Sequence, residues 1–297
     1  MKVIFWGTRG SGAAAGREYM DFGGNTSCVS AEWENGLFVF DAGTGIARLG
    51  EELIRRRFSG EIHLFLSHFH LDHICGLPLF APAFCPGVQM HVYGYTVDKK
   101  GVEECVRQVL SPPYWPVAPE CYGAQIFWHD VDLQEKDAGA VVRKQQGFLR
   151  GSLKAGNNKE GLDWEVKALK AAHPDGGLIY RLEAGGCSVV YGLDCELPEC
   201  FQEIYADFAK EADLLIFDAA YTDQEYPKVK GFGHATWQQG LAMAKRTKAV
   251  RTVFAHHRRE RTDKELDALD QAVRSQGLQV CFGKEGMEII LQEVCSG

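Results

Sequence analysis

The sequence predicts an α/β fold in which two β-sheets pack face to face and helices cover their outer surfaces. Three observations lead to this prediction. Short apolar runs of strand length alternate with amphipathic helical stretches along the chain of 297 residues. The first series of strands and helices is followed by a second, similar series, with no clean linker between them. Hydrophobic residues make up 45% of the chain and charged residues 24%, which is typical of a globular protein.

In the first half of the chain, short strands alternate with helices. The strands are predicted at 3–6, 28–33, 37–40, 62–66, 88–93 and 125–128, and the helices at 46–57 and 99–110. The strand runs are short and apolar, whereas apolar residues in the helical stretches recur every three or four positions. The run at 62–66 has a special place, because a cluster of polar residues follows it directly.

The second half continues this alternation without repeating the sequence. Strands are predicted at 165–171, 178–182, 188–191, 214–217, 251–254 and 288–291, and helices at 199–210, 236–245 and 263–275. Thr236 and Thr262 are the predicted N-caps of two of these helices. We expect a single domain over residues 1–297, with insertions at about 95–125 and 137–161. The second insertion is polar and rich in glycine, lysine and asparagine, which indicates a surface loop.

Four potential metal ligands lie within six residues directly after the run at 62–66: His68, His70, Asp72 and His73. Zinc, manganese and iron accept imidazole nitrogen and carboxylate oxygen as ligands. A strand alternates its faces and a helix repeats every ~3.6 residues, so neither points all four side chains at one place. We therefore expect an irregular loop at the end of the strand. Burying these groups without a partner is costly, which predicts a metal site with two metals.

Three later polar residues share one context, because each follows an apolar strand. His173, Asp194 and His256 come after the strands at 165–171, 188–191 and 251–254. The ends of neighbouring strands gather at one edge of a sheet, which is a common location for active sites. Taken alone, each is better explained as an ordinary polar strand end. Behind the four-residue cluster, they are predicted to complete the two coordination shells. His257 is a rival of His256, and we prefer His256 because it is the first residue past its strand.

This arrangement resembles the metallo-β-lactamase superfamily, through the pattern His68-Phe69-His70-Leu71-Asp72-His73 and the three later residues. The resemblance runs over nearly the whole chain. It implies a four-layer αββα sandwich of two mixed β-sheets flanked by helices, with a dinuclear metal site at the edge of the sheets. It also implies which side chains have which role: His68, His70 and His173 on the first metal, Asp72, His73 and His256 on the second, Asp194 as the bridge, and Asp41 orienting a ligand histidine or the loop.

Two features are similar to the phosphodiesterase or tRNase Z-like branch of this superfamily. Aspartate at the bridging position, Asp194, looks like the hydrolases of phosphodiesters and thioesters. The segment Gly233-His234-Ala235-Thr236-Trp237 resembles an element whose histidine donates a proton to the leaving oxygen. This resemblance implies that His234 is a general acid, and the alternative is a surface histidine at the start of a helix.

Two further segments are candidate substrate-binding elements. Asn25, Thr26 and Ser27 belong to a loop similar to one in phosphodiesterase-like relatives, where backbone N–H groups would approach an anion. A tight turn explains this loop equally well. Tyr114 and Trp115 lie between prolines and would form a wall against which a nucleobase stacks. A loop that closes the hydrophobic core explains them at least as well.

Together these features predict a dinuclear metal-dependent hydrolase, with zinc as the first choice of metal and manganese or iron as alternatives. We expect a phosphodiesterase that acts on a small, cyclic-nucleotide-like phosphodiester through a metal-bridging hydroxide, with Asp72 and His234 as catalytic residues. One alternative is a hydrolase of thioesters or lactones on the same metals. Another is a non-enzymatic diiron sensor of redox state or oxygen, to which the ten cysteines would point.

The charge of the chain argues against nucleic acid as a partner. The formal net charge is −8 and the pI is near 5.7, so we expect no general affinity for a phosphate backbone and regard transfer RNA processing as a poor fit. No apolar stretch reaches membrane-spanning length, and scattered cysteines favour a cytoplasmic protein with reduced thiols. Cys75 and Cys195 near the predicted ligands are either soft extra donors or, by preference, buried fillers. A homodimer is expected from base rates alone.

Overall fold

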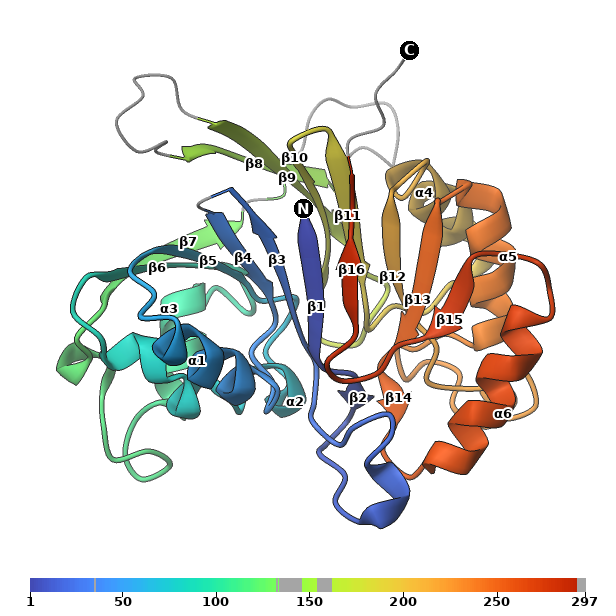
Figure 1. Ribbon diagram of the computed structural model, residues 1–297, viewed down its shortest axis with the longest axis horizontal. Helices are drawn as coiled ribbons and strands as arrows, with labels where there is room; N and C mark the ends of the chain where they lie inside the picture. Colours follow the sequence, from blue (N-terminus) through green and yellow to red (C-terminus); the bar gives the residue numbers. More distant parts are fainter. Residues whose placement is uncertain (35, 132, 134–145, 154–161, 293–297) are drawn as a thin grey trace.

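The computed structural model describes residues 1–34, 36–131, 133, 146–153 and 162–292, and its centre is a pair of stacked β-sheets (Figure 1). Within this part of the chain, the first sheet contains, in spatial order, β16 (Glu288–Ile290), β1 (Lys2–Gly7), β3 (Cys28–Trp33), β4 (Gly36–Phe40), β5 (Gly60–Phe65), β6 (Val88–Tyr95) and β7 (Gln125–Val131). The pairs from β16 to β4 are antiparallel and those from β4 to β7 are parallel, so the sheet is mixed.

The second sheet is mixed in the same way. It contains, in spatial order, β15 (Val280–Phe282), β13 (Arg251–Ala255), β12 (Leu214–Asp218), β11 (Cys187–Gly192), β10 (Leu178–Ala184), β9 (Leu162–Lys170) and β8 (Gln146–Leu153). Its pairs are parallel from β15 to β11 and antiparallel from β11 to β8. A separate parallel pair of two-residue strands, β2 (Arg9–Gly10) and β14 (His257–Arg258), joins the early chain to its C-terminal part.

Helices cover the outer face of each sheet (Figure 1). On the first sheet these are α1 (Ile46–Arg55) and α3 (Val102–Val109), and on the second α4 (Glu199–Phe208), α5 (Trp237–Thr247) and α6 (Asp263–Arg274). Short 3-10 helices lie in the connections: η1 (Arg17–Tyr19), η2 (Leu77–Leu79), η3 (Ala81–Phe84), η4 (Pro119–Cys121) and η6 (Tyr226–Lys228). The predicted αββα sandwich of two mixed sheets is therefore confirmed.

Three hydrophobic clusters hold these four layers together. The central cluster lies between the sheets and includes Phe5, Phe40 and Tyr180, all without exposed surface. A second cluster packs the second sheet against α4, α5 and α6, and a third packs the first sheet against α1 and α3. Because the inner strands β4, β11 and β12 are covered on both faces, every residue in them is buried.

Most predicted elements are present close to their expected bounds, and the two predicted N-caps are confirmed. Thr236 and Thr262 each accept the backbone N–H three residues later and form capping boxes with Gln239 and Glu265. The helix expected at 99–110 begins only at Val102, because Asp130 of β7 accepts its N–H at 2.7 Å. A cap that comes from a distant strand leaves no local signal in the sequence.

The expected surface loop at 137–161 differs in part from the structure. Residues 146–153 form β8, which pairs with β9, and the rest of this insertion lies outside the described residues. The two-residue strands β2 and β14 were not predicted, since they are too short for any periodicity. The residues after β5 also differ, because part of the expected irregular loop is a single helical turn, α2 (Leu71–Ile74).

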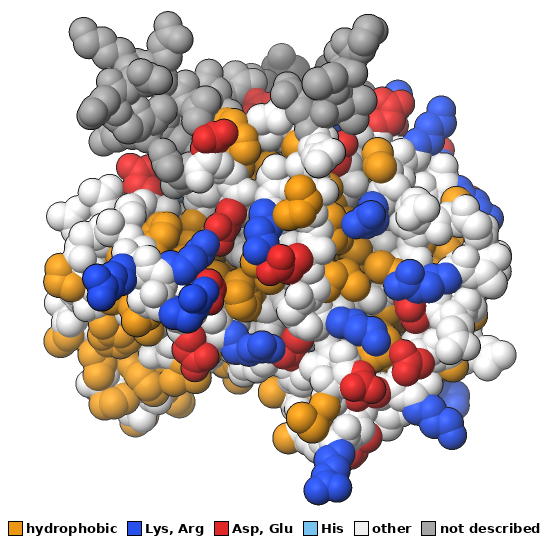
Figure 2. Space-filling model, in the orientation of Figure 1, with side chains coloured by type: hydrophobic (Ala, Val, Ile, Leu, Met, Phe, Trp, Pro, Cys, Tyr) orange, Lys and Arg blue, Asp and Glu red, His pale blue; other side chains and the backbone are white. Residues whose placement is uncertain are grey.

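The surface has one notably apolar region in the view of Figure 2. Hydrophobic side chains gather at the lower left of that view, over the part of Figure 1 in which α1 and α3 lie. Exposed large hydrophobic residues of the neighbouring segments include Leu79, Phe84 and Tyr114. Among the described helices, none has both the length and the apolar character needed to span a membrane.

Candidate metal centre

All seven predicted ligands lie at one edge of the sandwich, where strands of both sheets end. They follow the ends of β5, β9, β11 and β13 or belong to α2: His68, His70, Asp72, His73, His173, Asp194 and His256. The helical turn begins after His70 and places Asp72 and His73 beside the strand ends. The position of these residues after apolar strands therefore predicted that they would meet. The helical turn in the loop after β5 was not predicted.

Asp194 lies at the middle of the cluster, and its two carboxylate oxygens face different histidines. Oδ2 is 3.6 Å from Nε2 of His68 and 4.0 Å from Nε2 of His173. Oδ1 is 3.3 Å from Nε2 of His73 and 3.1 Å from Nε2 of His256. The carboxylate therefore stands between two separate sets of imidazoles.

The remaining predicted ligands complete these two sets. Nδ1 of His70 lies 3.2 Å from Nε2 of His173, so His70 belongs with His68 and His173 in what we call the first group. Oδ2 of Asp72 lies 3.2 Å from Nε2 of His73 and 3.3 Å from Nε2 of His256, and these three form the second group. All are buried or nearly so except His70, whose side chain is 45% exposed, so the cluster opens to solvent on the side of His70.

Hydrogen bonds to the far ring nitrogens show that the buried imidazoles present Nε2 to the centre. The Ser67 hydroxyl donates to Asp41, so its oxygen accepts from Nδ1 of His68 at 3.0 Å. Nδ1 of His73 donates to Asp41 at 2.6 Å, and Nδ1 of His173 donates to the Gly233 carbonyl at 3.1 Å. Nε2 of His68, Nε2 of His73 and Oδ1 of Asp194 are buried without any hydrogen-bond partner. Buried nitrogen and oxygen atoms that lack a hydrogen-bond partner can serve as ligands of divalent cations.

Asp41 organises the base of this cluster. Its carboxylate accepts the Ser67 backbone N–H at 2.7 Å and the Tyr191 hydroxyl at 2.8 Å, in addition to the bonds from Ser67 Oγ and His73. Asp41 itself has no exposed surface. By accepting hydrogen bonds from both Ser67, at the start of the loop after β5, and His73, it fixes their orientation. Ser67 and Tyr191 were not predicted, and only their contacts reveal them.

Several residues of the cluster adopt left-handed backbone conformations, which non-glycine residues rarely do. The φ angle is +59° for Asp41, +50° for Asp194, +57° for His256 and +61° for Ser11. The Ser11 N–H donates to Oδ2 of Asp72 at 2.7 Å. Strained residues of this kind persist only where the surroundings fix them, and they concentrate at functional sites.

His234 lies beside the cluster and is held by Asp218, a residue that was not predicted. Nδ1 of His234 is 2.9 Å from Oδ2 of Asp218 and 4.0 Å from Oδ2 of Asp194, and its ring stacks on His256 at 4.8 Å. Burial opposes protonation, but the charge and hydrogen bond of Asp218 raise the pKa of His234 to about 9. Asp218 ends the apolar strand β12, the same context that identified His173, Asp194 and His256, so this signal was present in the sequence.

The carboxylates of the cluster are ionised despite their burial. Burial alone favours the neutral acid, but His256, His73 and His68 hold the pKa of Asp194 well below its usual value. Burial acts in the same way on Asp72, and His73 and His256 likewise keep its pKa low. The centre therefore presents two negative charges and a set of imidazoles, which is the donor set that zinc, manganese or iron accepts.

The geometry separates His256 from its rival His257. His257 points away from the cluster, donates from Nε2 to the Gly283 carbonyl at 2.8 Å and packs beside Phe22 and Phe282. His256 is pressed against Gly10, where a Cβ atom would come within 2.2 Å of its ring. Glycine at position 10 is therefore required for β2 to lie against this imidazole.

The Asn25, Thr26 and Ser27 loop is engaged in internal hydrogen bonds and offers less to an anion than expected. The Asn25 backbone N–H donates to Glu285, and the Thr26 N–H donates to Oγ1 of Thr44 at 2.9 Å. Thr26 and Ser27 have no exposed surface. The alternative of a structural turn thus describes these residues better, because their polar groups join neighbouring loops.

Tyr114 and Trp115 are not brought to the cluster. Trp115 packs against the hydrophobic cluster under α1 and α3, while Tyr114 is 78% exposed. Neither has a hydrogen bond or ring contact with the seven predicted ligands in the described part of the chain. Trp115 therefore fits the alternative, a loop that helps to close the core, whereas the exposed Tyr114 does not. The packing of α3 and its neighbouring loop on the first sheet distinguishes the two interpretations, and the local sequence does not reveal this packing.

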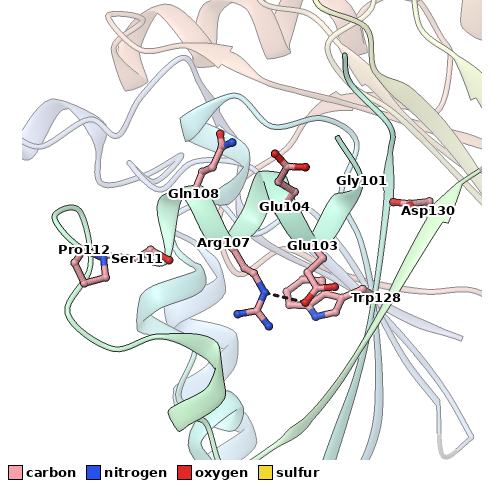
Figure 3. A pocket seen from close by; sticks show the side chains of 9 residues that line it. All are labelled: Gly101, Glu103, Glu104, Arg107, Gln108, Ser111, Pro112, Trp128 and Asp130. Carbon is pink, nitrogen blue, oxygen red and sulfur yellow. Dashed lines mark hydrogen bonds and ion pairs between the residues drawn. The ribbon is translucent and has the colours of Figure 1, made fainter. Parts of the chain in front are cut away.

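A surface cavity of about 810 Å³ lies next to this loop, and none of the predicted ligands lines it. It runs between α3 and β7, with Glu103, Glu104 and Arg107 on the helix and Trp128 and Asp130 on the strand (Figure 3). Arg107 is paired with Glu103 at 2.8 Å. This cavity is therefore separate from the candidate metal centre.

Of the two cysteines near the cluster, Cys195 is buried and Cys75 is half-buried. Cys195 is buried and its Sγ lies 3.3 Å from the Glu196 carbonyl, and burial raises its pKa. Burial also raises the pKa of Cys75. In the described residues, the groups with metal-binding geometry contain only histidine and aspartate, and the cysteines are free thiols.

Comparison with known proteins gives a consistent family and fold. A model described as the Beta-lactamase superfamily domain matches residues 37–257. A ribonuclease Z of Methanosarcina acetivorans is 26% identical over 294 residues, covering 89% of each chain. The human tRNase Z short form superposes with a TM-score of 0.61 at 20% identity over 98% of this chain and 100% of its own. The metallo-beta-lactamase fold protein YhfI from Bacillus subtilis gives a TM-score of 0.65 at 20% identity, covering 97% of this chain and 98% of its own.

These relatives correct the expectation about nucleic acid. The net charge was taken to argue against a nucleic-acid partner, and this is wrong, because relatives that match along most of the chain are ribonucleases. Net charge describes only the average field of the molecule, whereas a polyanion meets the local charges around a site. Bound cations would add positive charge at the point where a phosphate has to approach.

Proposed function

Because the chain belongs to the metallo-β-lactamase superfamily, we propose that it is a dinuclear metal-dependent hydrolase of phosphodiester bonds. The resemblance expected from the sequence is thereby confirmed by the family match over residues 37–257. The observation that carries the proposal is the Asp218–His234 pair, which stands 4.0 Å from Asp194 at the edge of the two histidine groups. An acid in this place suits a reaction with a basic leaving oxygen.

The cations would be held by the two groups around Asp194. His68, His70 and His173 would hold one, Asp72, His73 and His256 the other, with Asp194 shared between them. Zinc is our first choice, since imidazole and carboxylate ligands suit it, with manganese and iron as alternatives. Two bound divalent cations supply a water that ionises near neutral pH and positive charge for the phosphate oxygens.

His234 would act as the general acid. Its Nδ1 is occupied by Asp218, which leaves Nε2 to carry a proton towards the leaving oxygen. The charge and hydrogen bond of Asp218 raise the pKa of His234, which favours the protonated imidazole that an acid needs before it donates. Asp72, held by the Ser11 N–H, would fix the second cation and face the attacking water.

Two substrates fit this chemistry. A small, cyclic-nucleotide-like phosphodiester needs only the cluster and His234. RNA is the second candidate, and we favour it because the ribonuclease Z relatives match 89% and 92% of this chain. Thioesters or lactones on the same metals, and a diiron centre that senses oxygen or redox state, remain as alternatives to phosphodiester hydrolysis.

A substrate panel with the metal-loaded protein tests the proposal. The panel contains an RNA with a 3′ extension, a cyclic nucleotide, bis-p-nitrophenyl phosphate, a thioester and a lactone, with metal content measured on the same sample. We expect hydrolysis of the phosphodiesters and about two metals per chain. Activity on the acyl substrates alone would contradict the proposal. Iron with an oxygen-sensitive absorption spectrum and no hydrolysis would favour the sensor.

A further inference from the structure

We propose that residues 228–232, here called the 228–232 turn, bind a nucleotide of single-stranded RNA next to the scissile phosphodiester. In this proposal a base stacks on Phe232, and neighbouring phosphates lie against Lys228 and Lys230. The inference rests on the proposed phosphodiesterase function and names the part of the chain that selects a nucleotide substrate. None of these residues was singled out by the sequence.

The turn is attached directly to the metal centre. Gly233 follows Phe232, and its carbonyl accepts from Nδ1 of His173 at 3.1 Å. A Cβ atom on Gly233 would lie 2.0 Å from that nitrogen, so the backbone here touches the imidazole. Phe232 directly precedes Gly233, and consecutive Cα atoms are ~3.8 Å apart. Its backbone is therefore adjacent to the residue that contacts His173 of the first group. His234, the proposed acid, is the next residue after Gly233.

The local backbone presents Lys230 and Phe232 to solvent. The Phe232 N–H donates to the Val229 carbonyl at 3.0 Å, which closes a four-residue turn. Gly231 at its third position has φ +89°, a value that suits glycine in a type II turn. Phe232 is 59% exposed, although large aromatic residues usually bury their rings. An exposed ring beside a site that we assign to phosphodiesters is a stacking surface for a base.

The turn is braced by Glu196, which is half-buried. Glu196 accepts the Gly231 N–H with both carboxylate oxygens at 3.0 Å, and it also accepts the Tyr226 hydroxyl. Glu196 comes two residues after Asp194, and its own N–H donates to the Ala172 carbonyl at 2.9 Å. The same backbone segments that position Asp194 and His173 therefore hold the turn. A platform fixed in advance loses little freedom when a ligand binds.

The two lysines of the turn are available for phosphates. Lys228 and Lys230 are exposed and have no ion pair within the described part of the chain. Two nearby arginines differ, because Arg258 and Arg261 are both paired with Glu225. Free lysines combined with an aromatic ring are the usual means by which proteins bind single strands without reading the sequence. The global net charge of −8 does not oppose this local attraction.

Binding of a single-stranded RNA tests the role of Phe232. The metal-loaded protein is titrated with a fluorescent oligonucleotide made resistant to cleavage by phosphorothioate links, and its rate on methyl p-nitrophenyl phosphate is measured in parallel. Since a stacked base contributes ~1–3 kcal/mol, Phe232→Ala should weaken binding about 5- to 150-fold. The rate on the small substrate should stay within about twofold of the wild type, and Phe232→Trp should restore binding.

The lysines are tested through the salt dependence of the same binding. Each phosphate contact to a single strand contributes a slope of about −0.7 to log K against log salt, so Lys228→Ala/Lys230→Ala should make this slope less negative by about 1.4. Val250→Ala and Lys245→Ala/Lys248→Ala are matched controls. These residues precede β13, whereas His256 follows its other end, so they lie at the opposite edge of the sheet. The controls should bind like the wild type.

The outcomes separate this inference from the proposed function. If Phe232→Ala and the double lysine variant bind the oligonucleotide as the wild type does, the turn is not the binding element, although the enzyme still cleaves phosphodiesters. If the wild type cleaves no phosphodiester in the panel, the function itself fails. A loss of binding in the controls equal to that in the turn variants would also overturn the inference.

Discussion

At the scale of single residues, the centre depends on pairs in which one side chain fixes another. Asp218 holds Nδ1 of His234, and Asp41 holds Nδ1 of His73, so each imidazole directs Nε2 to its task. Both carboxylates are fully buried. Their contribution is to orientation and to charge, and it disappears if either partner is replaced.

The first prediction concerns His234. His234→Ala should reduce kcat about 10²- to 10⁴-fold on a phosphodiester with an alkyl leaving group, because that oxygen needs a proton to depart. The loss should be much smaller with a p-nitrophenyl leaving group, which departs as a stable anion. Metal content should be unchanged, measured by elemental analysis. His129→Ala, on β7 away from the cluster, is the control, and equal losses on both leaving groups would exclude an acid role.

Residue patterns in the sequence predict much of the centre. His173, Asp194 and His256 are found because each follows an apolar run, and Asp218 shows that the same rule applied once more would have found a fourth. The partners that act through space give no such signal. Ser67, Tyr191 and the Gly233 carbonyl contact the cluster only because the two sheets meet there. Phe232 was not predicted for the same reason.

The second prediction concerns a buried histidine that belongs to none of the described groups with metal-binding geometry. His63 of β5 stacks between Phe38 at 5.5 Å and His91 at 5.1 Å. Burial, with the neighbouring imidazoles of His91 and His129, lowers its pKa from 6.5 to about 3. Below pH 6.5, His63 binds a proton in the unfolded chain but not in the folded chain. His63 therefore lowers the free energy of unfolding progressively as the pH falls towards 3.

His63→Phe should remove this loss while keeping the stacked ring. From the two pKa values, the variant should lose about 3 kcal/mol less unfolding free energy than the wild type between pH 7 and pH 4. The measurement is urea unfolding at both pH values. His129→Phe, on a half-buried histidine of the same sheet, should give a smaller difference. Parallel pH curves for His63→Phe and wild type would contradict the assignment.

At the scale of elements, local signals set the ends of helices only where the cap is local. The Thr262–Glu265 box of α6 is visible in the sequence, and the structure contains it. The start of α3 is set by Asp130, a residue of the following strand, and was predicted three residues too early. The β8 strand was taken for loop because its run is polar and glycine-containing, and its pairing with β9 decides its conformation.

The third prediction concerns the capping of α6. Thr262→Ala removes the hydroxyl that accepts the Glu265 N–H, so the unfolding free energy should fall by about 1 kcal/mol. Gln271→Ala, on the exposed side of the same helix, should be neutral or slightly stabilising because alanine favours helices. Urea unfolding of both variants gives the comparison. A Thr262→Ala variant as stable as Gln271→Ala would show that the box contributes nothing.

At the scale of the whole molecule, the centre joins distant parts of the chain. The first and second groups take side chains from loops that follow strands of both sheets, and Asp194 links the groups. The fold class was predictable from the alternation of strands and helices. Each sheet buries one face against the other sheet and the other face under helices, which gives four layers. The wrong expectation about nucleic acid belongs to this scale as well, because the net charge does not show where on the surface the charged residues lie.

The fourth prediction concerns removal of the metals. Ligands that bind only the folded state stabilise it by about 4 kcal/mol at a thousandfold excess over Kd, so a chelator should lower the Tm of the loaded protein markedly. Asp194→Ala should start at the lower Tm and should not respond to chelator, because the shared ligand is gone. Calorimetric scans with and without chelator provide the test. A chelator response of equal size in this variant would show that Asp194 is not shared between the cations.

The pairing of β2 with β14 bears on how the protein is made. Asp72 and His256 face each other although 184 residues separate them in the chain, and Gly10 closes over His256 only once β14 has formed. During translation, His68, His70 and His73 leave the ribosome well before His173 and His256. A nascent chain therefore first exposes a loop with incomplete metal sites. The second group is therefore complete only after translation of His256, whereas the first group needs only His68, His70 and His173.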